Sequence, residues 1–407
     1  MNRTIFERAA GVFGGTVDPA TGNRLLCLCR RGDRPVEQVW QTLYQQCRCF
    51  LDGGRTVLLR TSSGPWWPRQ GGVSMLLLDL ETGRSTSPFP PGWDVVEVDD
   101  RADTALLVRW QDGAAALWDR RTGRILACEP ADPGWEYGGA TLLADGRRIL
   151  VSHFQGRPYR ERVRSHIHLL APGEPARVVL AAEEHYCNHL QGDPTDPDRF
   201  SYDRWPTPAR DVDQVIHVAA LDGSFHEPAR LDARAPRPLS MFGARDHYLW
   251  MPDGRRIVSY LNPAPFDGPV PVRVGAKLEM GDDFNHFHFP WVLSALDWRT
   301  GEDLSAPYPP GRWGCHPAVS PDSRFIVSAG GPGFDFLYAV DVEGLRSGWN
   351  ETPVCAYPRT VSRGENHEPF AFPFFLPDGS GVLFNAGWPG PEHGLYLAEW
   401  PAGFAGR

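Results

Sequence analysis

A short turn of the Asp/Pro/Gly type returns seven times along the chain, and this repeat constrains the fold more than any other feature of the sequence. Each turn precedes a run rich in β-branched and apolar residues, and most units add a second such run that ends in Asp. The turns are Asp52-Gly53-Gly54, Asp99-Asp100-Arg101, Asp145-Gly146-Arg147, Asp196-Pro197-Asp198, Asp253-Gly254-Arg255, Asp322-Ser323-Arg324 and Asp378-Gly379-Ser380. Units of roughly 46 to 70 residues with about four strands each are typical of β-propellers.

The repeat therefore predicts an all-β fold, a seven-bladed β-propeller with four-stranded antiparallel blades, that occupies residues 1–407 as a single domain. Two separate β-sandwiches would not explain why one motif runs through the whole chain. A closed ring needs its last blade fastened, so we expect residues 11–30 to supply a strand to the blade at residues 382–400.

Composition excludes several classes of partner. The net charge is -9 and no basic block is present, which argues against nucleic acid and anionic membranes as partners. The first eight residues lack the apolar run of a signal peptide, and no segment approaches eighteen consecutive apolar residues, so we expect a cytoplasmic protein. We expect it to be a monomer or a homodimer. The eight cysteines show no zinc-binding spacing.

Four histidines stand about six to eleven residues ahead of successive turns. They are His189, His247, His316 and His367. Equivalent positions of neighbouring blades converge on the central channel of a propeller, where neutral imidazoles suit a divalent metal or a general base. Histidines at repeat positions can also brace blades through hydrogen bonds. No metal-binding motif with defined spacing is present.

The segment around the first of these histidines, His185-Tyr186-Cys187-Asn188-His189-Leu190-Gln191, is the best candidate for a catalytic base. Candidate substrate-binding residues are Gln191, Arg245 and Trp205. Arg204 and Arg245 could each pair with a substrate carboxylate, because a guanidinium group matches a carboxylate in a bidentate way. Tryptophan rings could stack on sugars or simply pack between blades.

The sequence resembles the oligogalacturonate lyases, seven-bladed propellers that cleave short pectic oligosaccharides by β-elimination. The resemblance is carried by Leu43-Tyr44-Gln45-Gln46-Cys47 before the first turn, by Asn188-His189 with Asp196, and by His247-Tyr248-Leu249-Trp250-Met251-Pro252-Asp253-Gly254. It implies that His189 is the catalytic base and that His247 is a manganese ligand.

The sequence also departs from that family. The family's other metal ligands, a glutamine and two histidines, correspond to His367, Phe370 and Phe372. The family's manganese site therefore cannot be present in its usual form. His166 stands where the family has a catalytic arginine, and two histidines about twenty residues apart are similar to the pair in the propeller ulvan lyases.

These observations predict a carbohydrate lyase that acts on a uronate-containing oligosaccharide. In this hypothesis His189 is the base, His166 with Arg204 or a metal neutralises the substrate carboxylate, and Tyr248 is an acid. His247, His316 and His367 would hold the metal, which could be Mn²⁺, Ca²⁺ or Zn²⁺. Two alternatives stay open: a non-catalytic propeller that binds a glycan or protein, and a hydrolase or isomerase that uses carboxylates such as Glu183, Glu184 and Glu368.

Overall fold

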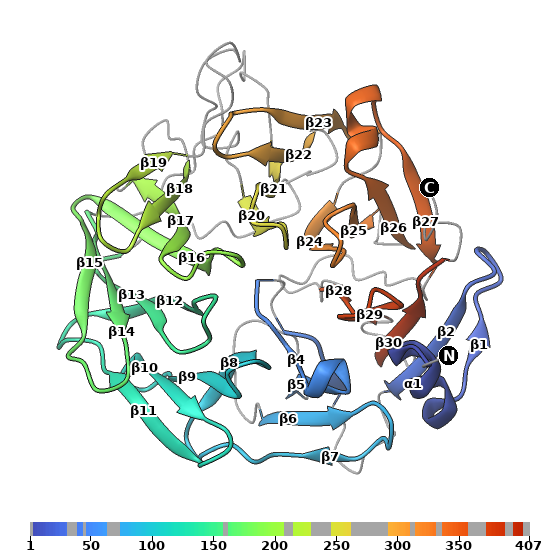
Figure 1. Cartoon of the computed structure of the whole chain (residues 1–407), viewed down its shortest axis with the longest axis horizontal. Coiled ribbons are helices and arrows are strands. Elements are labelled where there is room, and N and C mark those ends of the chain that lie inside the picture. Colours follow the sequence, from blue (N-terminus) through green and yellow to red (C-terminus); the bar gives the residue numbers. More distant parts are fainter. Residues whose placement is uncertain are drawn as a thin grey trace.

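Seven antiparallel sheets surround a central axis in the computed structural model of the chain (Figure 1). The structure describes residues 3–30, 39–43, 46–62, 74–157, 162–206, 215–228, 246–261, 292–309, 314–330, 336–356, 372–386 and 394–401. The predicted seven-bladed β-propeller is confirmed. Each predicted turn leads into the second strand of its blade, from the innermost strand in blades 2 to 7 and from the short strand Phe50–Leu51 in blade 1.

The first three blades follow the chain from the innermost strand outward. Blade 1 consists of β3 (Val39–Gln41), β5 (Thr56–Ser62), β6 (Ser74–Asp79) and β7 (Ser85–Thr86), and β4 (Phe50–Leu51) also pairs with β5. Blade 2 consists of β8 (Asp94–Asp99), β9 (Thr104–Arg109), β10 (Ala114–Asp119) and β11 (Arg124–Glu129). Blade 3 consists of β12 (Glu136–Leu142), β13 (Ile149–Gln155), β14 (Arg164–Leu170) and β15 (Arg177–Ala182).

The next three blades repeat this order. Blade 4 consists of β16 (His185–Gly192), β17 (Arg199–Pro206), β18 (Val215–Ala220) and β19 (His226–Pro228). Blade 5 consists of β20 (Asp246–Trp250), β21 (Arg256–Leu261), β22 (Val292–Asp297) and β23 (Asp303–Pro307). Blade 6 consists of β24 (Gly314–Val319), β25 (Phe325–Gly330), β26 (Phe336–Asp341) and β27 (Glu351–Cys355), and a 3-10 helix, η3 (Glu343–Ser347), precedes its last strand.

Both ends of the described chain meet in blade 7. Its strands β28 (Phe374–Phe375), β29 (Gly381–Ala386) and β30 (Gly394–Glu399) continue into β2 (Arg24–Arg30) and β1 (Thr16–Val17) from the N-terminal region. β2 runs antiparallel to β30, with Leu26 opposite Leu397. The predicted closure of the ring by the N-terminal segment is therefore confirmed (Figure 1).

A helix that the sequence repeat does not predict, α1 (Ile5–Phe13), covers the seam between blades 7 and 1. Its first turn is capped by Thr4, and the backbone N–H of Ile5 donates to Oδ2 of Asp378 at 2.7 Å. A Cβ atom at Gly54, in the short 3-10 turn η1 (Asp52–Gly54), would lie only 2.5 Å from Cδ1 of Ile5. Glycine at this turn thus lets the helix approach the ring. No helix in the described residues is both long and apolar enough to span a bilayer.

The core lies between neighbouring blades. Strands in the middle of a sheet are buried on both faces. In β10, the third strand of blade 2, five of six residues are buried, whereas the outermost strand β11 is largely exposed. Between blades 3 and 4, Leu150 and Ile167 pack with Phe200 and Tyr202 from the next sheet. This face-to-face packing fixes the innermost strands around the channel, where the candidate site is built.

Candidate active site

The innermost strands share an irregularity that brings the predicted histidines to equivalent places. In blades 2 to 6 the pairing of the innermost strand with the second strand shifts once, as in a β-bulge. The shifts lie between Val95 and Glu97, Tyr137 and Gly139, Asn188 and Gln191, Asp246 and Leu249, and Cys315 and Ala318. His189, His247 and His316 all fall within such shifts. Bulges of this kind re-aim a side chain and often lie beside active sites.

His189 is held by a buried carboxylate that the sequence analysis did not single out. Its Nδ1 atom lies 2.6 Å from Oδ2 of Asp203 on β17, and the relative side-chain exposures are 22% for His189 and 0% for Asp203. A carboxylate can only accept, so Nδ1 carries the proton and Nε2 of the neutral ring keeps its lone pair. The backbone of His189 has a φ of 48°, a left-handed conformation that non-glycine residues seldom adopt. This pair can work as a general base with an orienting partner.

Tyr248 supports the same bulge from blade 5. Its hydroxyl donates a hydrogen bond of 2.6 Å to the backbone oxygen of His189, and its side chain is fully buried. Burial raises the pKa of the Tyr248 hydroxyl well above its ordinary value. These contacts do not favour the predicted role of Tyr248 as an acid that reaches the substrate. They favour a role in positioning His189.

Gln191 also serves the fold, although it was predicted to bind substrate. Its Nε2 donates to the backbone oxygen of Tyr248 at 2.9 Å, and its Oε1 accepts from the backbone N–H of Trp250 at 3.2 Å. Gln46 of blade 1 donates to that same Tyr248 oxygen at 3.0 Å. The amide of Gln191 therefore ties β16 to β20, with Gln46 reaching the same point across the channel.

Arg204 is a half-buried cation at the end of β17. Its Nη2 lies 3.1 Å from Nδ1 of His185, and its Nε is buried without a hydrogen-bond partner in the described part of the chain. No described carboxylate lies within ion-pair distance of it. Successive side chains of a strand point to opposite faces of the sheet. Arg204 follows Asp203 directly, so its side chain points to the face of the blade opposite Asp203. It is available to an anion, and it does not contact the His189–Asp203 pair.

The structure does not bring His166 to His189. His166 lies on β14, the third strand of blade 3, whereas His189 is on the innermost strand of blade 4. Its ring centroid is 4.4 Å from that of Trp135 and 6.0 Å from that of His168. The predicted joint action of these two histidines on one sugar is therefore not supported by the contacts of His166.

The predicted metal ligands are only partly within the described structure. His367 and Arg245 lie outside the described residues, and for His247 and Trp205 only the backbone is described. The ring of His316 is 2% exposed and packs against Phe372 at a centroid distance of 4.5 Å. No group of three metal-ligating side chains occurs among the residues that the structure describes. Because His367 and the side chain of His247 lie outside the described residues, the predicted metal site stays a prediction.

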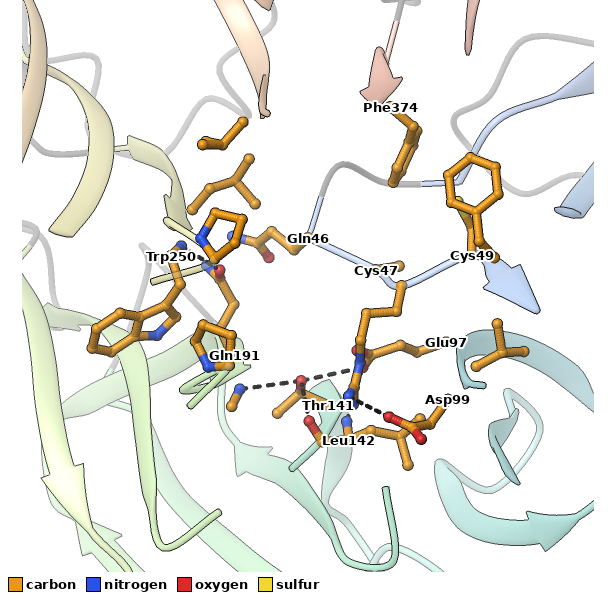
Figure 2. A pocket seen from close by; sticks show the side chains of 18 of the residues that line it. Gln46, Cys47, Cys49, Glu97, Asp99, Thr141, Leu142, Gln191, Trp250 and Phe374 are labelled. Carbon is orange, nitrogen blue, oxygen red and sulfur yellow. Dashed lines mark hydrogen bonds and ion pairs between the residues drawn. The ribbon is translucent and has the colours of Figure 1, made fainter. Parts of the chain in front are cut away.

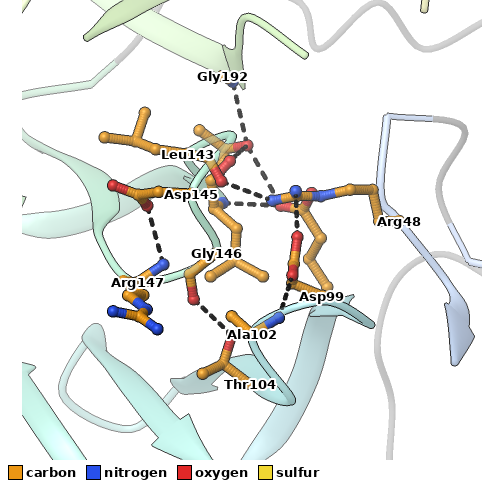
Figure 3. A network of polar contacts seen from close by, with 12 residues as sticks. Arg48, Asp99, Ala102, Thr104, Leu143, Asp145, Gly146, Arg147 and Gly192 are labelled. Carbon is orange, nitrogen blue, oxygen red and sulfur yellow. Dashed lines mark hydrogen bonds and ion pairs between the residues drawn. The ribbon is translucent and has the colours of Figure 1, made fainter. Parts of the chain in front are cut away.

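A second feature of the channel, a cavity of about 530 Å³, lies where the innermost strands lead into the repeated turns (Figure 2). Glu97 and Asp99 line one side of it, Gln191 lies beside Trp250 at another side, and Phe374 lies apart from both. Arg48 fills the part of the cavity next to Glu97 and Asp99. It contacts Glu97 at 2.6 Å, Asp99 at 2.7 Å and the backbone oxygen of Leu143 at 3.2 Å, and so ties blades 1, 2 and 3 together (Figure 3).

Two features of this site escaped sequence reasoning. Asp203 lies in the β-rich run that follows the Asp196-Pro197-Asp198 turn, and an acidic residue inside such a run was the signal that could have pointed to it. Its partnership with His189 depends on how β17 pairs with β16, which no local pattern reveals. Arg48 lies just after the predicted Leu43-Tyr44-Gln45-Gln46-Cys47 segment, but its carboxylate partners are about fifty residues away.

No protein-family model matches the sequence, and no match to a curated protein is found. Solved structures do match. An oligogalacturonate lyase in complex with manganese is 18% identical, with 96% of this chain and 97% of that chain covered and a TM-score of 0.70. An oligogalacturonate lyase from Vibrio parahaemolyticus is 16% identical over the same shares, with a TM-score of 0.69. The β-propeller domain of Cps50 (Swd1) from Myceliophteria thermophila, at 10% identity, covers 88% of this chain and 98% of its own, with a TM-score of 0.50. The chain is thus similar in fold, over nearly its whole length, to the oligogalacturonate lyases.

Proposed function

We propose that this protein is a carbohydrate lyase that cleaves a uronate-containing oligosaccharide by β-elimination. The observation that carries the proposal is the pair formed by His189 on the innermost strand of blade 4 and Asp203 on the second strand. The fold similarity to oligogalacturonate lyases supports the same class of reaction. A buried Asp beside Nδ1 selects the tautomer in which Nε2 carries the lone pair, and a base that removes a proton in β-elimination needs such a lone pair.

In the proposed reaction, Nε2 of His189 removes the proton from C5 of the uronate. The electron pair of that C–H bond forms the C4=C5 double bond, and the C4–O4 bond breaks. The departing O4 takes a proton from water, and the proton that His189 removed returns to the solvent, so that one product has a new sugar end and the other is an unsaturated uronate. Asp203 stabilises the imidazolium that forms and holds the ring in its productive orientation.

The substrate carboxylate must be neutralised, because a second negative charge would otherwise develop beside it. Arg204 was predicted for this task, but its side chain leaves the face of blade 4 opposite Asp203 and does not contact the His189–Asp203 pair, so another cation has to supply the positive charge beside His189. His247, His316 and His367 are the residues that would hold a divalent metal, and no step of this mechanism passes through one.

The decisive experiment incubates the purified protein with defined uronate oligosaccharides and follows the ultraviolet absorbance of the conjugated, unsaturated product. We expect absorbance to rise with the wild-type protein and to stay flat with His189→Ala. Asp203→Asn should lower kcat by about a hundredfold or more, because the amide no longer stabilises the imidazolium.

Chelator-treated and metal-supplemented samples belong in the same assay. Loss of activity with chelator and its return with Mn²⁺ would show that a metal takes part. New reducing ends without ultraviolet absorbance would instead indicate hydrolysis and would overturn the lyase proposal. Absence of any product across the panel would favour a propeller that only binds its ligand.

A further inference from the structure

Three tryptophans lie in loops at the end of the ring where the innermost strands begin, which is the end opposite the repeated turns. Trp93 lies just before β8, Trp110 in the turn between β9 and β10, and Trp135 just before β12. In each blade the loop that enters the innermost strand and the turn that joins the second and third strands share one end of the ring. These three side chains therefore belong to one rim, over blades 2 and 3.

Trp110 is the most exposed of the three and is held in place on two sides. It is 40% exposed and is the one aromatic residue among the large, exposed hydrophobic side chains that the structure describes. Its indole N–H donates to a carboxylate oxygen of Asp94, and its ring stands edge-on to Tyr137, with a centroid distance of 5.0 Å and an interplanar angle of 85°. We call Trp110, Tyr137 and Asp94 the Trp110 platform. A fixed, exposed ring with polar neighbours is the arrangement that stacks on the C–H face of a sugar.

The other two tryptophans are less available. The guanidinium of Arg109 lies over the Trp93 ring at 4.7 Å. Trp135 is half-buried against His166, with Arg164 at 5.8 Å from its centroid. These contacts leave Trp110 as the ring of this rim best placed to meet a ligand.

The Trp110 platform is joined to the candidate active site by two glycines. Tyr137 is followed on β12 by Gly138 and Gly139, where the strand bulges. A Cβ at Gly139 would lie 3.7 Å from the backbone nitrogen of His189, and one at Gly138 would lie 3.3 Å from the backbone oxygen of Cys187. The start of β12 therefore packs directly against the β16 bulge. Because Tyr137 is two residues from this contact, the Trp110 platform adjoins the part of the channel that holds His189.

The charge of the rim restricts which sugar suits the platform. The charged groups that contact the Trp110 platform or directly flank it are Asp94, Arg109 and Asp112. Asp112 already neutralises Arg109 through an ion pair of 2.6 Å. A second uronate would meet net negative charge here, whereas the hydroxyl groups of a neutral sugar can donate to the carboxylates.

We propose that the Trp110 platform is a subsite for a neutral pyranose residue of the same oligosaccharide whose uronate is bound at His189. This inference rests on the proposed function for the uronate at His189. It narrows the substrate class to oligosaccharides in which a uronate is joined to a neutral sugar, rather than chains of uronates alone.

The test measures binding by calorimetry in the His189→Ala protein, so that no ligand is consumed. Two trisaccharides of equal length are compared, one with neutral sugars beside the uronate and one built of uronates only. We expect the first to bind more tightly. Trp110→Ala should weaken its binding by about three- to tenfold and leave the all-uronate ligand little changed. Ile125→Ala is the matched control, because Ile125 is 42% exposed on the outer strand β11 of the same blade.

Asp94→Asn provides a second variant that keeps an acceptor for the indole N–H while it removes a charge. We expect Asp94→Asn to reduce the difference in affinity between the neutral-flanked and the all-uronate trisaccharides. Equal binding of both ligands by the His189→Ala protein with and without Trp110→Ala would overturn the proposal, as would a preference for the all-uronate ligand that depends on Trp110. If the protein with His189 intact forms no unsaturated product from either trisaccharide, but Trp110-dependent binding of the neutral-flanked one persists, then the lyase proposal fails and the subsite stands.

Discussion

The innermost strands of blades 4 and 6 place a histidine at the same point of the repeat and give it two different environments. His189 on β16 and His316 on β24 both lie in a bulge, with left-handed φ values of 48° and 56°. His189 contacts the buried carboxylate of Asp203 and remains 22% exposed. His316 packs against the ring of Phe372 and is 2% exposed.

The repeat determines the backbone conformation at these two positions, whereas residues from other strands determine whether the imidazole can act as a base. A left-handed residue in a bulge turns its side chain out of the regular ladder in both blades. A carboxylate beside the ring makes a base that can accept a proton, and an aromatic ring beside it makes a packed core residue. Position in the repeat alone therefore does not identify a catalytic histidine.

Replacing each histidine in turn tests whether the two environments give different functions, and it has the largest expected effect. We expect His189→Ala to lower kcat by about 10³-fold or more on a uronate oligosaccharide, because it removes the base. His316→Ala should keep kcat within about threefold of wild type and should lower the free energy of unfolding by about 2 kcal/mol, because it empties a packed site. Steady-state kinetics and urea denaturation measure the two effects.

Circular dichroism provides the control that both variants are folded. If folded His316→Ala loses as much activity as His189→Ala, then the two sites work together and the comparison is wrong. Restoration of that activity by added metal would assign His316 to a metal site.

The partner of His316 gives the next largest effect. Phe372 is 2% exposed and also has a left-handed φ of 38°, just before the innermost strand of blade 7. Phe372→Ala should destabilise the protein by about 3 kcal/mol in urea denaturation, because it leaves a cavity beside His316. Phe372→Leu, which fills part of that space, should cost about half as much. A stability change below about 0.5 kcal/mol for both variants would contradict the packing role.

Most of the fold could be predicted because its signals are local. Each Asp/Gly turn and the apolar run after it are contiguous in sequence, and all seven turns lie where the repeat predicts them. The helix α1 was missed because its buried face is only three residues, Ile5, Phe6 and Ala9, and its capping partner Asp378 lies at the other end of the chain. Local patterns carry no information about such a distant partner.

The site could be predicted only in part for the same reason. His189 was found from its place in the repeat. Its partner Asp203, and the burial of Tyr248 and Gln191, depend on which strands pair and on how blades 4 and 5 pack. His166 was paired with His189 through the family resemblance and their spacing of about twenty residues, but its ring lies beside Trp135 and His168 of blade 3. Spacing along the chain is a poor guide to distance across a propeller.

The activity of a Tyr248 variant distinguishes two roles of this residue, positioning His189 and donating a proton to the leaving group, and the expected effect is smaller. Its hydroxyl donates to the backbone oxygen of His189. Tyr248→Phe should therefore lower kcat by about tenfold and the free energy of unfolding by about 1 kcal/mol, with the KM little changed. If Tyr248 were the acid for the departing O4, the loss should exceed about a hundredfold and should shrink for a substrate with a better leaving group. Such a pattern, measured with two leaving groups, would restore the acid role.

The smallest expected effect is a change of stability with pH that comes from His168, a partly buried histidine of blade 3. Burial, followed by the nearby His153 and His166, lowers the pKa of His168 from 6.5 to about 4, with Asp132 acting in the opposite direction. The unfolded chain then binds a proton at pH values where the folded protein does not, so the free energy of unfolding should fall as the pH drops from 6.5 toward 4. Because the site is partly open to solvent, we expect His168 to contribute on the order of 1 kcal/mol. His168→Gln should flatten this dependence in urea denaturation at about pH 7 and pH 5, whereas a slope equal to that of wild type would show that other groups cause the acid sensitivity.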